Sequence, residues 1–365
     1  MKISFLFGSG ISIPAGFPNI TQITNNILSG KNIFPNISGN NLEQQKLIRI
    51  IQFINILKVD FRDHYSFRNR EMNYEDIYYL ADSIHQDENM NYENPIVYFY
   101  SKNFEKEYPQ LLESIYPELE GKERIIDLAS YTKDYISEIV TGMLSMKPEH
   151  VDYLDFLSEI FRDEDLDYIN IFSLNHDKLI EKYFQSKSVN FSDGFNENGF
   201  WDGTFGERVK LLKLHGSIDW FEDYIDNPYL PNVHKNANRD NGLPILLIGS
   251  FNKLYEYSRN LNFKLQVLFY NYLNETNFLI ISGYGFGDQG INSKLFLWLY
   301  SSVKNRIILI HKDIEILNKT ARPAISNNLD TWISKGILIN IPKHIEEITW
   351  EEIKDIIQKN RLNFN

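Results

Sequence analysis

The feature that most constrains the fold is a junction near the start of the chain, where apolar residues 3–7 run directly into Gly8, Ser9 and Gly10. A short apolar run bounded by turn residues predicts a buried strand. Glycine has no Cβ, so the backbone after the strand can turn sharply and approach a ligand closely. Where a helix follows, its first amides face that ligand and favour an anion. The junction is therefore typical of a loop that holds a pyrophosphate.

Short glycine loops nevertheless follow strands in many α/β proteins that bind other ligands. This loop has neither the complete G-x-G-x-x-G spacing nor the G-x-x-x-x-G-K-[ST] spacing of nucleotide-binding motifs. Taken alone, it favours a nucleotide no more than another ligand, although such loops commonly lie at ligand sites. The choice depends on what the other predicted strands carry.

The length and charge of the chain limit its size class and its partners. With 365 residues the chain exceeds the usual size of a single core, so we expect one large domain with an insertion, or two domains. The formal net charge is -12, and no block of like charge forms a basic arm. Because nucleic-acid binding depends on neutralising phosphates, we expect no direct nucleic-acid binding, and any contact with DNA or RNA through a partner.

The absence of cysteine excludes disulfides, cysteine-based zinc sites and thiol nucleophiles. The sequence offers no convincing metal-ligating cluster, so no metal is expected. No basic-then-apolar segment opens the chain, and no apolar run reaches the length that spans a membrane. We therefore expect a cytoplasmic protein with no membrane partner.

The apolar pattern changes near residue 165. Before it, apolar residues recur every three or four positions, which predicts helices over residues 42–59, 74–84, 123–146 and 151–161. Asn73, which two acidic residues follow closely, is a candidate N-cap. After residue 165, short apolar runs predict buried strands of a parallel sheet, over residues 168–174, 209–214, 244–248, 277–282, 306–310 and 336–341.

This change of pattern predicts an α/β fold, namely a Rossmann-like parallel sheet flanked by helices, with an inserted all-helical subdomain and no zinc ribbon. The α/β domain comprises residues 1–20 and 166–345, and its helices include residues 262–273 and 293–303. Residues 21–165 form the helical insertion. Residues 346–365 form a C-terminal helix and tail, the helix predicted over 345–358. Residues 228–242, rich in Asn, Pro and Asp, predict a surface loop.

Unusual polar or glycine residues follow four of the predicted strands, at the edge where ligands bind in an open parallel sheet. The first group is the glycine loop at residues 8–10. The others contain Asn175 with Asp177, His215 before a glycine, and three glycines at positions 283, 285 and 287. Imidazole titrates near neutrality, so His215 is a candidate base. The alternatives are structural: residues 175–177 cap a helix, His215 is an ordinary core histidine, and Asp288 or Asn292 caps a helix.

The four groups together resemble the sirtuin family. Residues 8–12 followed by 16–18 resemble the signature Gly-Ala-Gly-x-Ser with Gly-Ile-Pro, with Ser9 and Phe17 as variant positions. Residues 175–177 resemble the Asn-Ile-Asp element, and residues 214–216 resemble the segment that carries the catalytic histidine. With residues 213–220 and 283–288, the set looks most like the sirtuin-like domains of bacterial anti-phage systems.

Two departures from the sirtuin deacylases bear on the activity. A chain without cysteine cannot build their four-cysteine zinc ribbon, and Asn19, Ile20 and Thr21 stand where many sirtuins carry Asp-Phe-Arg. The resemblance therefore implies NAD hydrolysis, the activity of the defence relatives, in preference to protein deacylation.

The resemblance also implies roles for particular residues. Asn175 positions the attacking water or the ribose, and His215 acts as general base, so these two are the candidate catalytic residues. The candidate NAD-binding residues cradle the pyrophosphate, contact the nicotinamide carboxamide and approach the adenosine half; they are Gly8, Ser9, Gly10, Ser12, Asp177, Gly283, Tyr284 and Gly285. Ser12 supports the loop.

An unrestrained NADase would kill its host, so we expect the activity to be gated. By family analogy, the partners are other copies of the chain, a hexameric ATPase or an Argonaute-like subunit. Three other functions stay open at this point. They are a module that senses NAD or an ADP-ribose-type nucleotide without turnover, an NAD-dependent deacylase, and, least favoured, a dehydrogenase.

Overall fold

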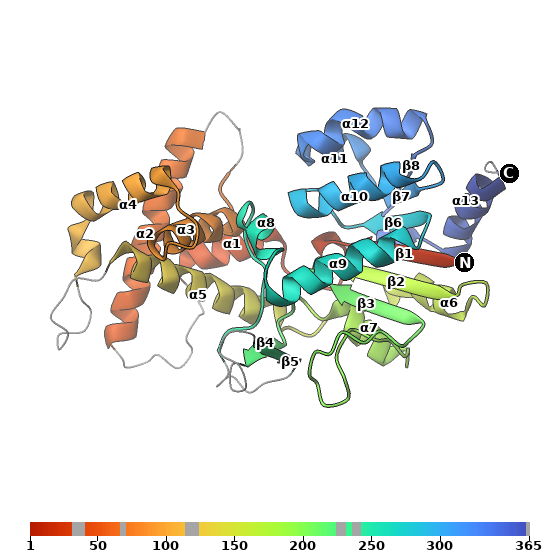
Figure 1. Ribbon diagram of the computed structural model, residues 1–365, viewed down its shortest axis with the longest axis horizontal. Helices are drawn as coiled ribbons and strands as arrows, with labels where there is room; N and C mark the ends of the chain where they lie inside the picture. The colour runs from red at the N-terminus through yellow and green to blue at the C-terminus, as the bar shows by residue number, and fades with distance from the viewer. Residues whose placement is uncertain (31–40, 66–70, 114–123, 224–230, 236–241, 363–365) are drawn as a thin grey trace. The chain divides into compact units, whose positions relative to one another are not determined.

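The computed structural model describes residues 1–30, 41–65, 71–113, 124–223, 231–235 and 242–362 (Figure 1). The chain divides into two compact units. The sheet unit comprises Met1–Phe17, Leu144–Leu247 and Leu254–Asn365, and the helical unit comprises Pro18–Met143 and Ile248–Lys253. The predicted domain limits stay a prediction.

The sheet unit is built on a six-stranded sheet of order β3-β2-β1-β6-β7-β8, in which every neighbouring pair is parallel. Its strands are β1 (Lys2–Phe7), β2 (Tyr168–Ser173), β3 (Val209–Lys213), β6 (Phe278–Ser282), β7 (Arg306–Ile310) and β8 (Leu338–Ile341). From β1 the chain proceeds outward to β2 and β3, returns to β6 beside β1, and then proceeds outward on the other side. This order is Rossmann-like, and it confirms the predicted fold class.

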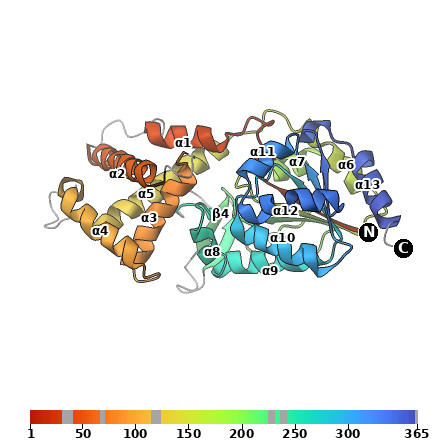
Figure 2. The ribbon, with the colours of Figure 1, turned by 90° about the horizontal axis from the view of Figure 1, so that it is seen from above.

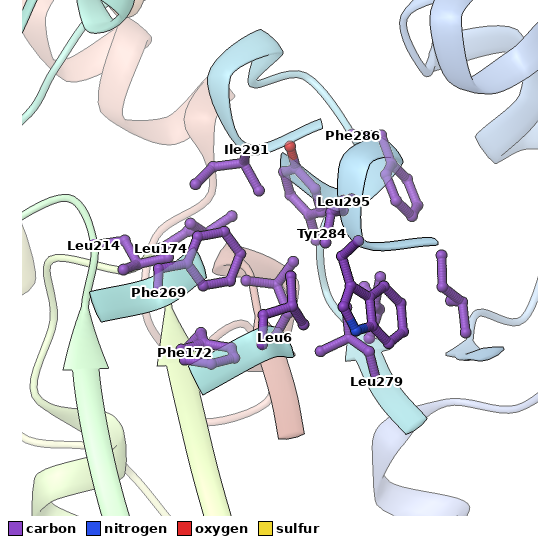
Figure 3. Packing of buried hydrophobic residues seen from close by; sticks show 14 of the residues in the cluster. Leu6, Phe172, Leu174, Leu214, Phe269, Leu279, Tyr284, Phe286, Ile291 and Leu295 are labelled. Carbon is purple, nitrogen blue, oxygen red and sulfur yellow. The ribbon is translucent and has the colours of Figure 1, made fainter. Parts of the chain in front are cut away.

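One face of the sheet carries a continuous apolar core (Figure 3). Leu6 is paired with Phe172, and both side chains belong to this core. Three helices cover the face with buried side chains, among them Phe269 and Trp298; they are α9 (Asn260–Asn274), α10 (Gln289–Ser301) and α12 (Pro323–Ser334). Because strand residues alternate between faces, this core accounts for half of each apolar run.

Helices on the opposite face account for the other half, which explains why the runs are apolar throughout. Figures 1 and 2 show α6 (Phe156–Arg162), α7 (Leu179–Ser186) and α13 (Trp350–Leu362) on the other side of the sheet from α9 and α10. Phe161 and Phe184 join α6 to α7 edge to face, with ring centroids 5.4 Å apart. The sheet unit also contains α11 (Ile314–Thr320) and the end of α8 (Asn252–Glu256), a helix that begins in the helical unit.

The helical unit contains no strand among its described residues. Its helices are α1 (Ile20–Ser29), α2 (Asn41–Tyr65), α3 (Tyr74–Glu88), α4 (Pro95–Glu107) and α5 (Ile125–Leu144), whose last residue already belongs to the sheet unit. Asn73 accepts hydrogen bonds from the amides of Glu75 and Asp76, so its prediction as an N-cap is confirmed. Asn19 caps α1 in the same way, with Gln22 reaching back to the Asn19 amide.

One predicted strand is wrong. Residues 244–248 are not part of the sheet; Leu246 forms only an isolated antiparallel bridge with Gly216. Leu247 and Ile248 are apolar and buried. An apolar run indicates burial, but it cannot by itself distinguish a sheet strand from a packed loop. The Ile245 amide donates to the Trp220 carbonyl (2.7 Å) and the Leu247 amide to the His215 carbonyl (2.9 Å). The segment therefore supports the loop that carries His215.

Two smaller differences concern irregular segments. An antiparallel pair, β4 (Trp220–Asp223) with β5 (Asn232–Lys235), was not predicted, and β5 lies inside the predicted loop of residues 228–242, most of which falls outside the described residues. The C-terminal helix starts at Trp350, after a separate 3-10 turn over Ile345–Glu347. Within the described residues, no helix is both long enough and apolar enough to cross a membrane.

Candidate active site

The carboxyl ends of β1, β2, β3 and β6 are joined by backbone hydrogen bonds that continue the sheet. The Leu174 amide donates to the Phe7 carbonyl (2.9 Å), and the Leu214 amide donates to the Ser173 carbonyl (2.8 Å). On the other side of β1, the Gly8 amide donates to the Ser282 carbonyl (3.0 Å). All four predicted groups therefore leave one edge of the sheet side by side. The strand order reverses between β1 and β6, which is where ligands bind in such sheets.

The glycine loop after β1 packs backbone to backbone against the glycine loop after β6. A Cβ on Gly8 would lie 2.5 Å from the Gly283 carbonyl oxygen, and one on Gly10 would lie 2.7 Å from the Gly283 Cα. Gly283 has φ +67°, and a Cβ there would lie 2.5 Å from the Ile11 amide nitrogen. The absence of side chains at these three positions is thus required by the contact between the loops themselves. We call this backbone contact the glycine contact.

The amides of the first loop are largely taken by carbonyls within the same contact. The Gly10 amide donates to Gly283 (3.0 Å), the Ile11 amide to Gly8 (3.1 Å) and the Ser12 amide to Ser9 (3.0 Å). The helix that follows is only a 3-10 turn over Ser9–Ile11. The loop therefore does not present the row of free helix amides that the sequence suggested, while Ser9 is exposed.

Asn175, Ser12 and Asp177 form a buried polar cluster beside the glycine contact. The Ser12 hydroxyl donates to Asp177 Oδ2 (2.8 Å) and accepts from Asn175 Nδ2 (3.1 Å). Asn175 Nδ2 also donates to the Gly8 carbonyl (3.1 Å), which ties the loop after β2 to the loop after β1. Asp177 Oδ1 accepts from the amide of Leu179, the first residue of α7 (2.9 Å), although the N-cap position of this helix is Lys178.

The side-chain oxygen of Asn175 is buried and has no hydrogen-bond partner among the described residues. Both Nδ2 contacts fix the orientation of the amide, so Oδ1 cannot exchange places with the donor. An unsatisfied buried acceptor is destabilising by about 1–3 kcal/mol unless a ligand or water fills it. The residue is therefore oriented to accept a hydrogen bond from a bound hydroxyl or water.

His215 lies on the loop after β3, where Gly216 has φ +80° and a Cβ would lie 2.1 Å from the Ile245 carbonyl oxygen. The ring is buried, and Nε2 lies 2.7 Å from the Tyr257 hydroxyl and 3.1 Å from Asp288 Oδ2. Its ring centroid is 6.3 Å from that of His176 on the neighbouring loop. His215 thus has two polar partners that sequence analysis did not assign to it, and its role as a base stays a prediction.

Beneath the loop that carries Asn175 lies a buried cation. Lys213 donates to the carbonyls of Asp177 and His176 (3.3 Å for the latter) and to Glu181 Oε1 (3.0 Å). Burial raises the pKa of Glu181, an effect that Lys213 partly opposes. Burial would also raise the pKa of Asp219, but Lys213 and Lys178 hold it below its ordinary value. These charges fix the backbone that presents Asn175 and Asp177.

The predicted adenosine-contacting residues differ among themselves. Gly285 is exposed and a Cβ there would meet nothing within 4 Å. Tyr284 is buried, and its hydroxyl donates to Asn292 Oδ1 (2.9 Å) and accepts from the Asp288 amide (3.2 Å). Burial, with Asp288 nearby, raises the pKa of Tyr284 well above its usual range. Tyr284 therefore organises its own loop, whereas Gly285 leaves a surface open for approach.

Four residues near the predicted ones were not assigned to the site from the sequence. Tyr257 and Asp288 contact His215, Lys213 supports the loop after β2, and the Tyr153 hydroxyl donates to the Ile11 carbonyl (2.5 Å). Only Asp288 carried a signal, as a possible helix cap, and it does cap α10 through the Ile291 amide (3.0 Å). Tyr153 and Tyr257 come from distant segments, so no local pattern could have found them, whereas Lys213 lies in the same segment as His215 and was not assigned a role.

The fold gives the class of this protein, and comparison with known proteins gives the family that it resembles. The strand order of the parallel sheet defines a Rossmann-like class of fold. A family model described as SIR2-like domain matches residues 169–331, from β2 to α12. This segment is therefore similar to SIR2-like domains, and the sirtuin resemblance of the motifs is confirmed to that extent. A search among curated proteins finds no match.

Solved structures of Sir2 proteins resemble the chain along most of its length, with low scores. One titled "Structural Basis for the Mechanism and Regulation of Sir2 Enzymes" has 10% identity and a TM-score of 0.43, with coverage of 98% of this chain and 93% of that one. One titled as a Sir2 homolog–NAD complex has 11% identity and a TM-score of 0.40, with coverage of 100% and 91%. The fold assignment rests on the strand order itself.

Proposed function

We propose that this chain is an NAD hydrolase that cleaves the bond between nicotinamide and ribose and releases nicotinamide and ADP-ribose. The observation that carries the proposal is the buried, oriented and unsatisfied Oδ1 of Asn175, close in the fold to a buried histidine with a carboxylate partner. The match of residues 169–331 to SIR2-like domains supports NAD as the substrate.

In this reaction the bond from the ribose carbon to the nicotinamide nitrogen breaks, and its electron pair neutralises the positive pyridinium ring. Water supplies the oxygen that bonds to the same carbon, and its proton passes to His215, directly or through a ribose hydroxyl. Asn175 Oδ1 accepts a hydrogen bond from that water or from the ribose. Because the transition state resembles an oxocarbenium ion, fixing the acceptor in place is a large part of the catalysis.

Binding of NAD would use other residues of the loops at the carboxyl ends of the strands. Ser9 contacts the pyrophosphate, while Gly8 and Gly10 give the loop its shape. Asp177 meets the nicotinamide carboxamide, and Gly283 and Gly285 let the adenosine half approach. Ser12 holds Asn175 and Asp177 in register through its two hydrogen bonds.

The experiment is product analysis by mass spectrometry after incubation of the purified chain with NAD. General-base assistance contributes about 10²–10⁴-fold in rate, so we expect His215→Ala and Asn175→Ala each to lose nearly all nicotinamide release while the melting temperature stays close to the parent's. His64→Ala, an exposed histidine on α2, is the matched control. Full hydrolysis by both site variants would refute the proposal, and NAD bound without turnover would identify a nucleotide-sensing module.

We further propose that the hydrolase is a gated, cytoplasmic effector of bacterial anti-phage abortive infection. Gating would come from assembly of several copies, from a regulatory protein such as a hexameric ATPase or an Argonaute-like subunit, or from both. The acidic charge of the chain supports delegating any nucleic-acid sensing to that protein. Comparing NAD turnover by the chain alone and with the product of its neighbouring gene tests this; equal turnover at every protein concentration would contradict it.

A further inference from the structure

Three polar atoms from distant segments meet at the ring of His215. Nε2 lies 2.7 Å from the Tyr257 oxygen and 3.1 Å from Asp288 Oδ2, and the Tyr257 hydroxyl donates to the same Asp288 oxygen at 2.6 Å. All three side chains are largely buried. Every side of this triangle is within hydrogen-bond distance, so the number of protons in it can be counted.

The count fixes which ring nitrogen carries the proton. An ionised carboxylate can only accept, and a phenol has a single hydrogen to donate. Since that hydrogen goes from Tyr257 to Asp288, the short contact between Nε2 and the Tyr257 oxygen needs a hydrogen from Nε2. A neutral imidazole with its proton on Nε2 carries its lone pair on Nδ1.

We propose that Asp288 and Tyr257 are positioning residues that hold His215 in the Nε2–H form, so that Nδ1 is the atom that takes the proton from water or ribose. This inference rests on the proposed function for the role of His215 as base. When Nδ1 takes up the proton, the ring becomes a cation, and the Asp288 carboxylate stabilises it across the 3.1 Å contact. Neither positioning residue exchanges a proton with the substrate.

Both partners are fixed by contacts of their own. Asp288 Oδ1 caps α10 by accepting from the Ile291 amide (3.0 Å), which leaves Oδ2 for Tyr257 and His215. The Tyr257 ring packs over Gly290, where a Cβ would lie 2.4 Å from the ring carbon Cε2. The helix cap thus fixes the position of Asp288, and the close contact with Gly290 fixes the ring of Tyr257.

Among the described residues, two further ionisable side chains lie near the triangle. His176 lies on the loop after β2, with its ring centroid 6.3 Å from that of His215. Lys294 on α10 lies over the Tyr257 ring, 5.2 Å from the centroid, and burial lowers the pKa of its amine. Asp288 is an anion in direct contact with the ring, so we expect it to stabilise the charged histidine.

Two nearly isosteric variants separate positioning from simple packing. Asp288→Asn keeps an acceptor for the helix cap but turns a donor toward Tyr257; the phenol must then donate to Nε2, which moves the ring proton to Nδ1. Tyr257→Phe removes the hydroxyl but leaves Nε2 within 3.1 Å of the carboxylate, so the ring keeps the Nε2–H form. A purely structural role predicts no such contrast.

The first measurement is nitrogen NMR of histidine-labelled protein, with the His215 signals assigned by their loss in His215→Gln. We expect the parent and Tyr257→Phe to be protonated at Nε2, and Asp288→Asn to be protonated at Nδ1. A parent ring protonated at Nδ1, or an Asp288→Asn ring unchanged from the parent's, would overturn the proposal. This readout needs no turnover, so it stands apart from the failure of the proposed function, which is a parent protein that releases no nicotinamide.

The second measurement is the pH dependence of nicotinamide release by the same proteins. A carboxylate that fixes a histidine tautomer contributes up to about 10⁴-fold in kcat, so we expect Asp288→Asn to lose at least about 10²-fold with KM nearly unchanged. We expect Tyr257→Phe to lose about tenfold or less and to keep the parent's pH profile in shape. Equal losses in kcat for the two variants, with equal melting temperatures, would contradict the proposed positioning of His215 by Asp288.

Discussion

The edge formed by the carboxyl ends of β1, β2, β3 and β6 has two halves, and they are built differently. Between β1 and β6, the loops meet through backbone atoms at the glycine contact, and their amides are satisfied by carbonyls. After β2 and β3, the loops present buried polar side chains, one of which, Asn175, keeps an unsatisfied acceptor. In the first half the loop amides are paired with carbonyls, whereas in the second half one buried acceptor has no partner among the described residues.

This difference shows that a glycine-rich loop and a binding site are separate properties. The glycines at positions 8, 10 and 283 are needed for two loops to approach each other, whatever binds nearby. The chemistry proposed for this edge depends instead on two buried polar side chains, Asn175 and His215. The predictions below test whether stability and activity divide between the two halves in this way.

One of the two largest effects is expected at the glycine contact. Gly8→Ala places a Cβ 2.5 Å from the Gly283 carbonyl oxygen and 2.7 Å from the Tyr284 Cα, so the backbone itself must move. We expect a loss of about 3 kcal/mol in the free energy of unfolding, measured by urea denaturation. Gly285→Ala is the matched control: a Cβ there meets nothing, so stability should stay within about 0.5 kcal/mol. Equal stability of both variants would show that the glycine contact does not require a glycine at position 8.

The second prediction concerns the cation beneath the polar half. Lys213→Met leaves buried Glu181 without its partner, and breaking a buried ion pair in this way is destabilising by about 3 kcal/mol. Lys213→Met with Glu181→Leu should recover much of the stability but not the NAD turnover, because the carbonyls of His176 and Asp177 still lack their donor. Recovery of both would show that Lys213 does not position the loop.

The pH dependence of the Lys213→Met variant follows from Glu181. Burial raises the pKa of this carboxyl in the folded protein, and Lys213 opposes the rise, so its removal raises the pKa further. A group with a raised folded pKa binds more protons in the native state, and stability therefore falls as pH rises above the unfolded value of about 4.3. We expect the unfolding free energy of this variant to fall with pH more steeply than the parent's; parallel curves would exclude Glu181 as the cause.

A smaller effect is expected at Ser12, where the two halves touch. Ser12→Ala removes the donor to Asp177 and one acceptor of Asn175, while the Gly8 carbonyl still holds the Asn175 amide. We expect a loss of about 1–2 kcal/mol in stability together with a measurable fall in kcat. Ser293→Ala on the exposed face of α10 is the control. A stability loss with unchanged kcat would restrict Ser12 to the fold.

The smallest effect is expected at Asp219. Lys178 and Ser217 donate to its carboxylate, and its pKa in the folded protein lies below the ordinary value despite burial. Such a group contributes stability above its unfolded pKa of about 3.9, and this contribution is lost as pH falls through the folded pKa. Asp219→Asn should cost about 1 kcal/mol at neutral pH and flatten the acid limb of the unfolding curve. An acid limb identical to the parent's would contradict this.

Local sequence pattern predicted most of the sheet correctly because buried parallel strands leave long apolar runs. It was wrong at residues 244–248, where an apolar run is buried by packing against the loop of His215 and adds no strand. It missed β5, a four-residue strand in which only Val233 is apolar. Runs as short as these depend on their surroundings more than on their own composition.

The candidate site was predictable only in part. Strand ends placed Asn175, His215 and Gly283 on one edge because the carboxyl ends of parallel strands share that edge. Their detailed roles stay a prediction. The partners Tyr257 and Lys213 could not be found, since a lone tyrosine after a short helix and a lysine in a strand have no pattern that marks them.

The sequence by itself determined the periodicities that separate helices from buried strands, and the absence of cysteine that rules out a zinc ribbon. Only the tertiary structure decided which glycines serve contact between loops, and which polar atoms find partners. The physical reason is that periodicity is a local property of the chain, whereas hydrogen-bond satisfaction at the sheet edge depends on residues as far apart as Gly8 and Asn175, or His215 and Asp288.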